Sequence, residues 1–224
     1  MKKIVLGASI IFSMIVNAQN GILGNGVTDI DGNKYQSVII GTQEWMKENL
    51  KVSKYKDGTS IPNVKENSQW CNLTSGAYSY FNNDASHNVT YGKLYNWYAI
   101  DTKNICPTGW HVPSDADWSK LINFLGGEYR AIGKMTEPGK THWERSVDQY
   151  QPSNSSLFTA LPGSARNNEG CGFDSYIGRS GIWWSSSMRN STNPATVEIL
   201  LFESSIKYSA GSKSSGFSVR CLKD

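Results

Sequence analysis

The stretch Cys106-Pro-Thr-Gly-Trp-His-Val-Pro-Ser-Asp-Ala-Asp-Trp118 combines a turn, a short extended segment and the start of a helix. Ser114 is a suitable N-cap, and Asp117, three residues later, approximates a capping box. The apolar residues that follow recur on one helical face, and two glycines end the run. These residues are Trp118, Leu121, Ile122 and Leu125, followed by Gly126 and Gly127. The sequence therefore predicts a helix over residues 115–125.

A second informative segment, Gly216-Phe-Ser-Val-Arg-Cys-Leu222, is typical of a terminal strand. If Cys106 bonds to Cys221, the segment that enters the helix is linked to this last strand, and we take this pair as a prediction. Spacing alone does not choose among the three pairings that four cysteines allow. Cys71 and Cys171 would then bond to each other or stay free.

Residues 1–18 have the parts of a secretory signal peptide: two lysines, an apolar run over 4–16, and Ala18 before a cleavage site. An uncleaved anchor is the alternative, but the apolar run is short and has no stop-transfer flank. We therefore expect an exported protein, extracellular or at the cell surface, with the periplasm as another destination.

The charge balance gives no indication that the protein binds nucleic acid. Without its leader the chain has 20 basic and 19 acidic residues, and the basic ones are scattered. No second apolar run has membrane-spanning length, so the mature chain is expected to lack a membrane span. Richness in Gly, Ser, Asn, Trp and Tyr favours a turn-rich module that contains β-strands.

Strand patterns lie near both ends of the chain. Residues 27–46 predict a small N-terminal β-meander, and four later segments are strand-like: 182–186, 195–203, 206–209 and 217–222. Residues 51–93 and 136–181 are loop-dominated. The aromatic run at 94–100 fits either a strand or a short helix. The turn at 29–33 resembles part of a calcium loop but lacks its closing glutamate, which favours a plain turn with no cofactor.

Six ordered blocks resemble the Fibrobacter succinogenes major paralogous domain family. They lie at 29–35, 40–50, 91–99, 106–118, 181–187 and 216–221, and include Tyr-Gly-Lys-Leu-Tyr-Asn-Trp-Tyr-Ala and Gly-Ile-Trp-Trp-Ser-Ser-Ser. The resemblance implies a C-type-lectin-like α+β fold related to formylglycine-generating enzymes, with one main helix, short antiparallel strands and long irregular loops. It also implies a surface-associated role in bacteria such as Bacteroidetes. Residues 19–224 would form one such domain.

The residues give little support to enzymatic chemistry. The formylglycine-generating branch uses a nearby pair of cysteines, whereas Cys171 and Cys221 here are far apart in sequence. Known hydrolase, phosphate-loop and zinc patterns are absent, and the histidines His87, His111 and His142 are isolated in sequence. Motifs of calcium-dependent sugar binding are also missing. We therefore expect a protein that is not an enzyme and has no bound metal.

Binding residues are expected around two adjacent tryptophans, Trp183 and Trp184, which point to opposite faces of a strand. One should lie in the core, and the other would suit sugar stacking or a protein contact if exposed. The remaining candidates flank this pair or lie in the preceding loop: Arg166, Asn168, Tyr176, Arg179 and Arg189. The alternative is that both tryptophans pack under the loops.

Three functions are compatible with these patterns. The first is an exported module that binds a glycan or a surface protein through its loops. The second is an assembly subunit of a bacterial surface appendage. The third is a divergent enzyme of the formylglycine-generating type. The sequence does not predict the oligomeric state.

Overall fold

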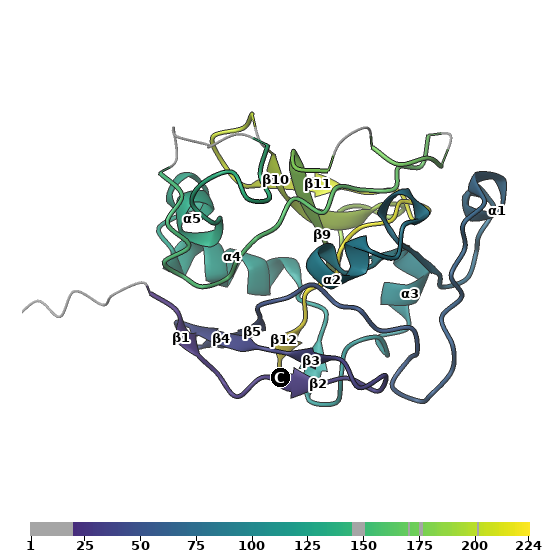
Figure 1. The fold of residues 1–224 in the computed structure, drawn as a ribbon, viewed down its shortest axis with the longest axis horizontal. Coiled ribbons are helices and arrows are strands. Elements are labelled where there is room, and N and C mark those ends of the chain that lie inside the picture. The colour runs from purple at the N-terminus through teal and green to yellow at the C-terminus, as the bar shows by residue number, and fades with distance from the viewer. Residues whose placement is uncertain (1–19, 145–150, 170, 175–176, 201) are drawn as a thin grey trace, which may run out of the picture.

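The computed structural model describes residues 20–144, 151–169, 171–174, 177–200 and 202–224 (Figure 1). The predicted signal peptide, residues 1–18, lies outside the described residues. Within those ranges no helix combines the length and apolar character that a membrane crossing needs. The fold mixes helices with several small antiparallel sheets, which confirms the α+β prediction at this level.

The first sheet joins the beginning and the end of the chain. Its antiparallel strands are, in spatial order, β1 (Ile22–Leu23), β4 (Ser37–Ile40), β5 (Gln43–Met46), β12 (Leu222–Lys223) and β8 (Trp110–His111). In β12, Leu222 pairs with Trp45 on one side and with His111 on the other. The segment that enters the main helix therefore lies directly beside the C-terminus (Figure 1).

A second antiparallel sheet carries the later strands in the order β11–β10–β9. These are β9 (Ser180–Met188), β10 (Pro194–Leu200) and β11 (Lys207–Ala210), so three of the four later strands are confirmed with shifted ends. Two short hairpin-like pairs complete the strands: β2 (Val27–Thr28) with β3 (Lys34–Tyr35), and β6 (Tyr78–Ser79) with β7 (Leu94–Tyr95). The meander predicted over residues 27–46 is therefore divided between two sheets. Strands β2 and β3 pair with each other, whereas β4 and β5 belong to the first sheet.

The predicted main helix is α4 (Asp115–Phe124). The Ser114 side chain accepts a hydrogen bond from the Asp117 backbone N–H, while the Asp117 carboxylate accepts one from the Ser114 backbone N–H. This reciprocal capping box satisfies backbone donors that an open helix end would leave unpaired. The four residues of the predicted apolar stripe are all buried.

The other helices are short. They are α1 (Asn67–Cys71), α2 (His87–Tyr91), α3 (Trp97–Asp101) and α5 (Glu128–Met135), with a 3-10 turn, η1, at Phe81–Asn83. The run at 94–100, which fits either a strand or a short helix, forms both. Its first two residues belong to strand β7, and α3 begins at Trp97. No sequence pattern predicts α5, because its N-cap residue, Gly127, has no side chain to cap the helix and the helix contains Gly133.

Two adjacent cores lie on the two faces of β9. Trp183 packs with Trp118 of α4 and Phe158, with ring centroids 6.3 and 6.4 Å away. Trp184 packs on the opposite side, against Trp97 of α3 and Phe217, at 5.4 and 4.6 Å. The prediction that the two tryptophans face opposite ways is confirmed.

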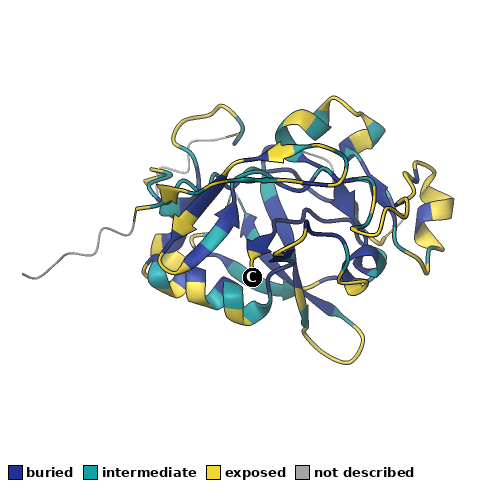
Figure 2. Cartoon of the chain, turned by 90° about the horizontal axis from the view of Figure 1, so that it is seen from below, coloured by how far each residue is buried: buried dark blue, intermediate teal, exposed yellow. Residues whose placement is uncertain are grey.

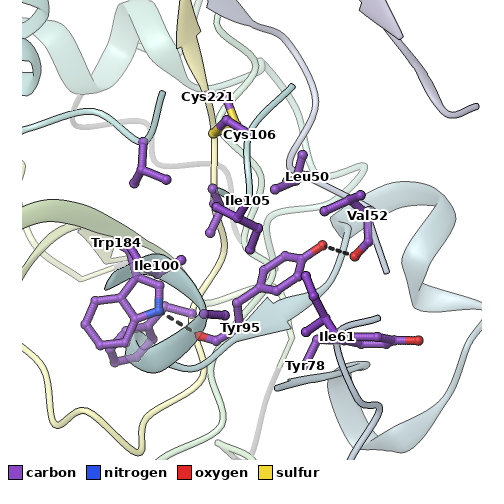
Figure 3. Close-up of a cluster of buried hydrophobic side chains, with 14 of the residues drawn as sticks. Leu50, Val52, Ile61, Tyr78, Tyr95, Ile100, Ile105, Cys106, Trp184 and Cys221 are labelled. Carbon is purple, nitrogen blue, oxygen red and sulfur yellow. Dashed lines mark hydrogen bonds between the residues drawn. A yellow bond between two sulfur atoms is a disulfide. The ribbon is translucent and has the colours of Figure 1, made fainter. Parts of the chain in front are cut away.

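The core on the Trp184 side contains the predicted disulfide between Cys106 and Cys221, whose Cα atoms are 6.0 Å apart (Figure 3). Hydrogen bonds run through this cluster: Trp184 Nε1 donates to the Tyr95 carbonyl at 2.7 Å, and the Tyr95 hydroxyl donates to the Val52 carbonyl at 2.7 Å. Buried polar groups are thus paired inside an otherwise apolar cluster.

The predicted strand at 217–222 is wrong over most of its length. Phe217 forms an isolated β-bridge with Tyr95 of β7, and Ser218 forms one with Trp183 of β9. Because the two partners belong to different strands, these bridges do not extend into a ladder. A regular ladder forms only at β12. The segment therefore links the two cores instead of extending one sheet.

Candidate functional site

A buried polar cluster joins four of the sequence blocks that carry the family resemblance. At its centre, Asn49 Oδ1 accepts hydrogen bonds from Trp183 Nε1 at 2.9 Å and from Arg220 Nη2 at 2.7 Å. Asn49 Nδ2 donates to the Tyr91 carbonyl at 2.9 Å. We call Asn49, Trp183 and Arg220 the central node. Its hydrogen bonds connect segments of the chain that are far apart in sequence.

Arg220 is fully buried, and no carboxylate forms an ion pair with it among the described residues. Its guanidinium donates to Asn49 and to the carbonyls of Phe158 and Thr159, and lies 4.3 Å from the Phe158 ring centroid. Burial lowers the pKa of Arg220 to about 9, which still leaves it charged near neutral pH. Its contacts mark it as a framework residue.

Arg166, predicted to bind a ligand, is instead a second buried framework arginine, and that prediction is wrong. Its guanidinium donates to the carbonyls of Cys171 and Val64 at 2.9 and 2.7 Å, and to Asn67 Oδ1 at 2.9 Å. It also lies 4.3 Å from the Trp70 ring centroid. All of these partners belong to the chain itself, and the buried side chain holds two loops together.

The second disulfide, between Cys71 and Cys171, joins the same two loops, with the Cα atoms 5.5 Å apart. Cys171 is buried, whereas Cys71 is exposed at the end of α1. Figure 2 shows that α1, at the far end of the molecule, is mostly exposed. This pairing was one of the alternatives that the sequence left open.

The tryptophans do not form an exposed binding surface. Trp183 and Trp184 are 1% and 0% exposed, so the prediction that one of them contacts a ligand is wrong and the alternative, in which both are packed, is right. The physical reason is that β9 lies between two cores and has no solvent-facing side at these positions.

The other predicted residues do not form one site. Arg179 and Arg189 flank opposite ends of β9, about 30 Å apart along an extended strand. Arg189 lies 3.6 Å from Asp115 at the start of α4, whereas Arg179 forms an ion pair with Glu144. Asn168 is exposed. The remaining candidate, Tyr176, lies outside the described residues.

Aromatic residues from three separate segments of the chain form a continuous series of ring contacts. We call Phe81, His87, Tyr91, His142 and Phe173 the aromatic row. Neighbouring ring centroids are 5.6 Å apart from Phe173 to Phe81, 5.6 Å from Phe81 to His87, 6.0 Å from His87 to Tyr91, and 6.0 Å from Tyr91 to His142. Phe81 is buried and the other four are half-buried, so ring surface is available to solvent.

Polar groups lie at one end of the aromatic row. His142 Nδ1 lies 2.6 Å from Glu137 Oε1, and the His142 backbone N–H donates to the same oxygen at 3.1 Å. Burial, together with the Glu137 carboxylate, raises the pKa of the Tyr91 phenol. The Glu144–Arg179 ion pair lies two residues further along the chain from His142. Arg179, one of the predicted binding residues, is thus placed beside the row.

Helix α2 supplies the middle of the row and lies between the two sheets in the view of Figure 1. Its Val89 side chain is 76% exposed, but Val89 is two residues from both His87 and Tyr91 on the helix and does not share their face. The histidines look isolated in the sequence, and no local pattern would have found this row. Its members come from three separate segments of the chain, at 81–91, 142 and 173, which meet only through the fold.

The turn with calcium-loop character has an internal explanation. Asp29 accepts hydrogen bonds from the backbone N–H groups of Asp31 and Asn33 at 3.0 and 2.9 Å, and from the Tyr35 hydroxyl at 2.6 Å. These donors occupy its carboxylate and hold the β2–β3 turn. Among the described residues, no three side chains of the types His, Cys, Asp and Glu are grouped so that they could hold a metal ion.

Together these features define a small, disulfide-linked α+β module with a buried polar framework and a half-exposed row of aromatic residues. The profile of the Fibrobacter succinogenes major domain matches residues 38–223, and the chain belongs to this family. No curated protein and no solved structure matches the chain.

Proposed function

We propose that this protein is an exported, non-enzymatic module that binds a glycan or a surface protein through its loops. The observation that carries the proposal is the aromatic row, because half-exposed rings with a polar rim suit sugar stacking and protein contacts alike. We also infer that the fold is C-type-lectin-like, as the family resemblance implies.

The polar end of the row supports recognition beyond simple stacking. Glu137 fixes the orientation of His142, and Glu144 does the same for Arg179, so donors and acceptors stand beside the ring surface in defined positions. Export fits the two disulfides, because such bonds form and persist in oxidising compartments.

A specific observation also favours assembly as a second function. Ile22 and Leu23 of the edge strand β1 are 68% and 60% exposed, and Ile39 beside them is 37% exposed. A groove of about 620 Å³ adjoins this edge, lined by residues 23–28 and 34–37. An exposed apolar edge of this kind can pair with another strand.

The third candidate, an enzyme of the formylglycine-generating type, gains no support. All four cysteines are in disulfides, so no free thiol is present for such chemistry.

The test uses the mature chain on a glycan array and on immobilised bacterial and host surface proteins. Tyr91→Leu keeps apolar volume but removes the flat ring, and His87→Ala removes the neighbouring ring. We expect each change to weaken binding at least about tenfold, in the range for loss of a central contact.

Tyr129→Ala is the matched control, because Tyr129 is 71% exposed on α5, outside the aromatic row. It should leave binding unchanged. Equal binding by the wild type, Tyr91→Leu and His87→Ala would show that the row is not the binding site. A wild-type chain that binds no glycan and no surface protein would overturn the binding function itself.

For the assembly function, size-exclusion chromatography at increasing concentration is decisive. Assembly through β1 predicts oligomers that Leu23→Lys abolishes. A wild-type chain that stays monomeric at high concentration would contradict it.

A further inference from the structure

A cavity of about 250 Å³ opens where the exit of α3, strand β8 and the end of β9 meet. Its apolar lining consists of Ile100, Ile105 and Val112, which are buried members of the core on the Trp184 side; Figure 3 labels the first two. The Ser186 backbone N–H donates at 2.8 Å to a carbonyl of the segment that follows β8, so the end of β9 is held against that segment. The walls of the cavity are therefore kept in place by the packed core behind them.

The polar groups of the cavity are mainly donors. They are the Lys103 ammonium and the Ser186 hydroxyl, beside the His111 ring, and no Asp or Glu is among the described residues that line it. Both nitrogens of His111 already face carboxylates, since Nδ1 lies 2.7 Å from Asp224 and Nε2 lies 3.6 Å from Asp117. Lys103 is exposed and forms no ion pair within the described ranges. It is therefore the group left to hold a ligand of opposite charge.

The volume of the cavity limits the ligand to a small molecule. A dry cavity of about 150 Å³ with aliphatic and aromatic walls is large enough for benzene, so this cavity has space for a ring or a short alkyl chain with one polar group attached. Small-molecule sites combine apolar walls with a few polar groups that fix the orientation of the ligand. Apolar walls with one unpaired cation at the rim select an apolar body that carries a negative charge.

We propose that this cavity is a binding site for small apolar monocarboxylates, such as aryl- or alkyl-substituted acetates. The apolar body packs on Ile100, Ile105 and Val112, and the carboxylate accepts hydrogen bonds from the Lys103 ammonium and the Ser186 hydroxyl. None of the residues that line the cavity belongs to the aromatic row. The inference therefore does not depend on the proposed function.

The test titrates phenylacetate into the isotope-labelled mature chain and follows the amide chemical shifts by NMR. We expect shifts at residues 100–106, 110–112 and 186, with a Kd of about 1 mM or tighter. Phenylacetamide and phenethylamine keep the ring but are neutral and cationic, so each should bind at least about fivefold more weakly. Acetate, which has no apolar body, should bind more weakly still. Shifts confined to other residues, no binding at about 10 mM phenylacetate, or equal binding of phenethylamine would overturn the proposal.

Lys103→Met removes the charge without disturbing the core, because Lys103 is exposed. It should weaken phenylacetate binding at least about fivefold and remove the preference over phenylacetamide, and Lys103→Arg should restore both. The matched control Lys120→Met, at an exposed position of α4, should change neither. Tyr91→Leu, in the aromatic row, should also bind phenylacetate as the wild type does. An unchanged preference for the carboxylate in Lys103→Met would contradict the proposal.

Discussion

The two disulfides lie in regions that are built in different ways. Cys106 and Cys221 are both buried and join the entrance of α4 to β12 within the core. Cys71 and Cys171 join peripheral loops, and Cys71 is exposed. In the first region a local pattern, the capped helix α4, determines much of the structure. In the second, one buried arginine and its backbone acceptors hold segments that have little regular structure of their own.

The largest expected effect comes from removing the core disulfide. Each bond closes a loop of similar length, with sequence separations of 115 and 100, so each has an entropic contribution of about 5 kcal/mol. Replacing Cys106 and Cys221 by alanine also leaves a cavity, and we expect a chain that does not fold at 37 °C.

The matched variant replaces Cys71 and Cys171 by alanine. Without this bond the two loops can open locally, which raises the conformational entropy of the native state. The loss in the free energy of unfolding should therefore be smaller than for the core disulfide. Circular dichroism and hydrogen exchange should show a folded core with a loosened loop region. Equal loss of stability in the two variants would remove the distinction between the regions.

The central node should have the next largest effect. Asn49→Ala leaves the buried Trp183 Nε1 without its acceptor and removes one acceptor of Arg220. We expect a loss of about 3 kcal/mol in the free energy of unfolding, measured by urea denaturation. The control Asn168→Ala changes an exposed residue and should stay within about 0.5 kcal/mol of the wild type.

Arg166→Met sharpens the comparison in the peripheral region. It leaves the carbonyls of Val64 and Cys171 without their donor, so the two loops should loosen while the core keeps its protection. Hydrogen exchange should rise in residues 64–71 and 166–174 before it rises in α4. Uniform loss of protection across the chain would show that this arginine supports the whole fold.

The smallest effect is expected at the α4 cap. Ser114→Ala should cost about 1 kcal/mol at neutral pH. Burial raises the pKa of Asp117, but hydrogen bonds from Ser114 and contact with His111 outweigh it and hold the pKa below its usual value. A lowered carboxylate pKa stabilises the fold above the unfolded-state pKa, and this is lost as pH falls through the folded-state pKa. The cost of Ser114→Ala should therefore shrink in acid; a constant cost would argue against the Asp117 contribution.

The sequence predicts the parts whose cause is local. Ser114 and Asp117 identify the start of α4 because capping depends on neighbours three residues apart. The opposite orientation of Trp183 and Trp184 follows from strand geometry. Helix α5 escapes prediction because it lacks a side-chain cap and contains Gly133, and forms by burying Ala131, Ile132 and Met135. The aromatic row and the role of Arg166 escape too, since their contacts span up to about a hundred residues of sequence.

The most direct test of the division between framework and binding surface measures ligand binding and melting temperature in parallel for Tyr91→Leu, Leu121→Ala and the wild type. A Tyr91→Leu chain should lose binding on the glycan array or to surface proteins at least about tenfold and melt within a few degrees of the wild type. Leu121 is buried in α4 and is not a member of the aromatic row, so Leu121→Ala should melt far lower, yet bind normally at temperatures where it is folded. Retained binding by Tyr91→Leu, or lost binding by folded Leu121→Ala, would contradict the division.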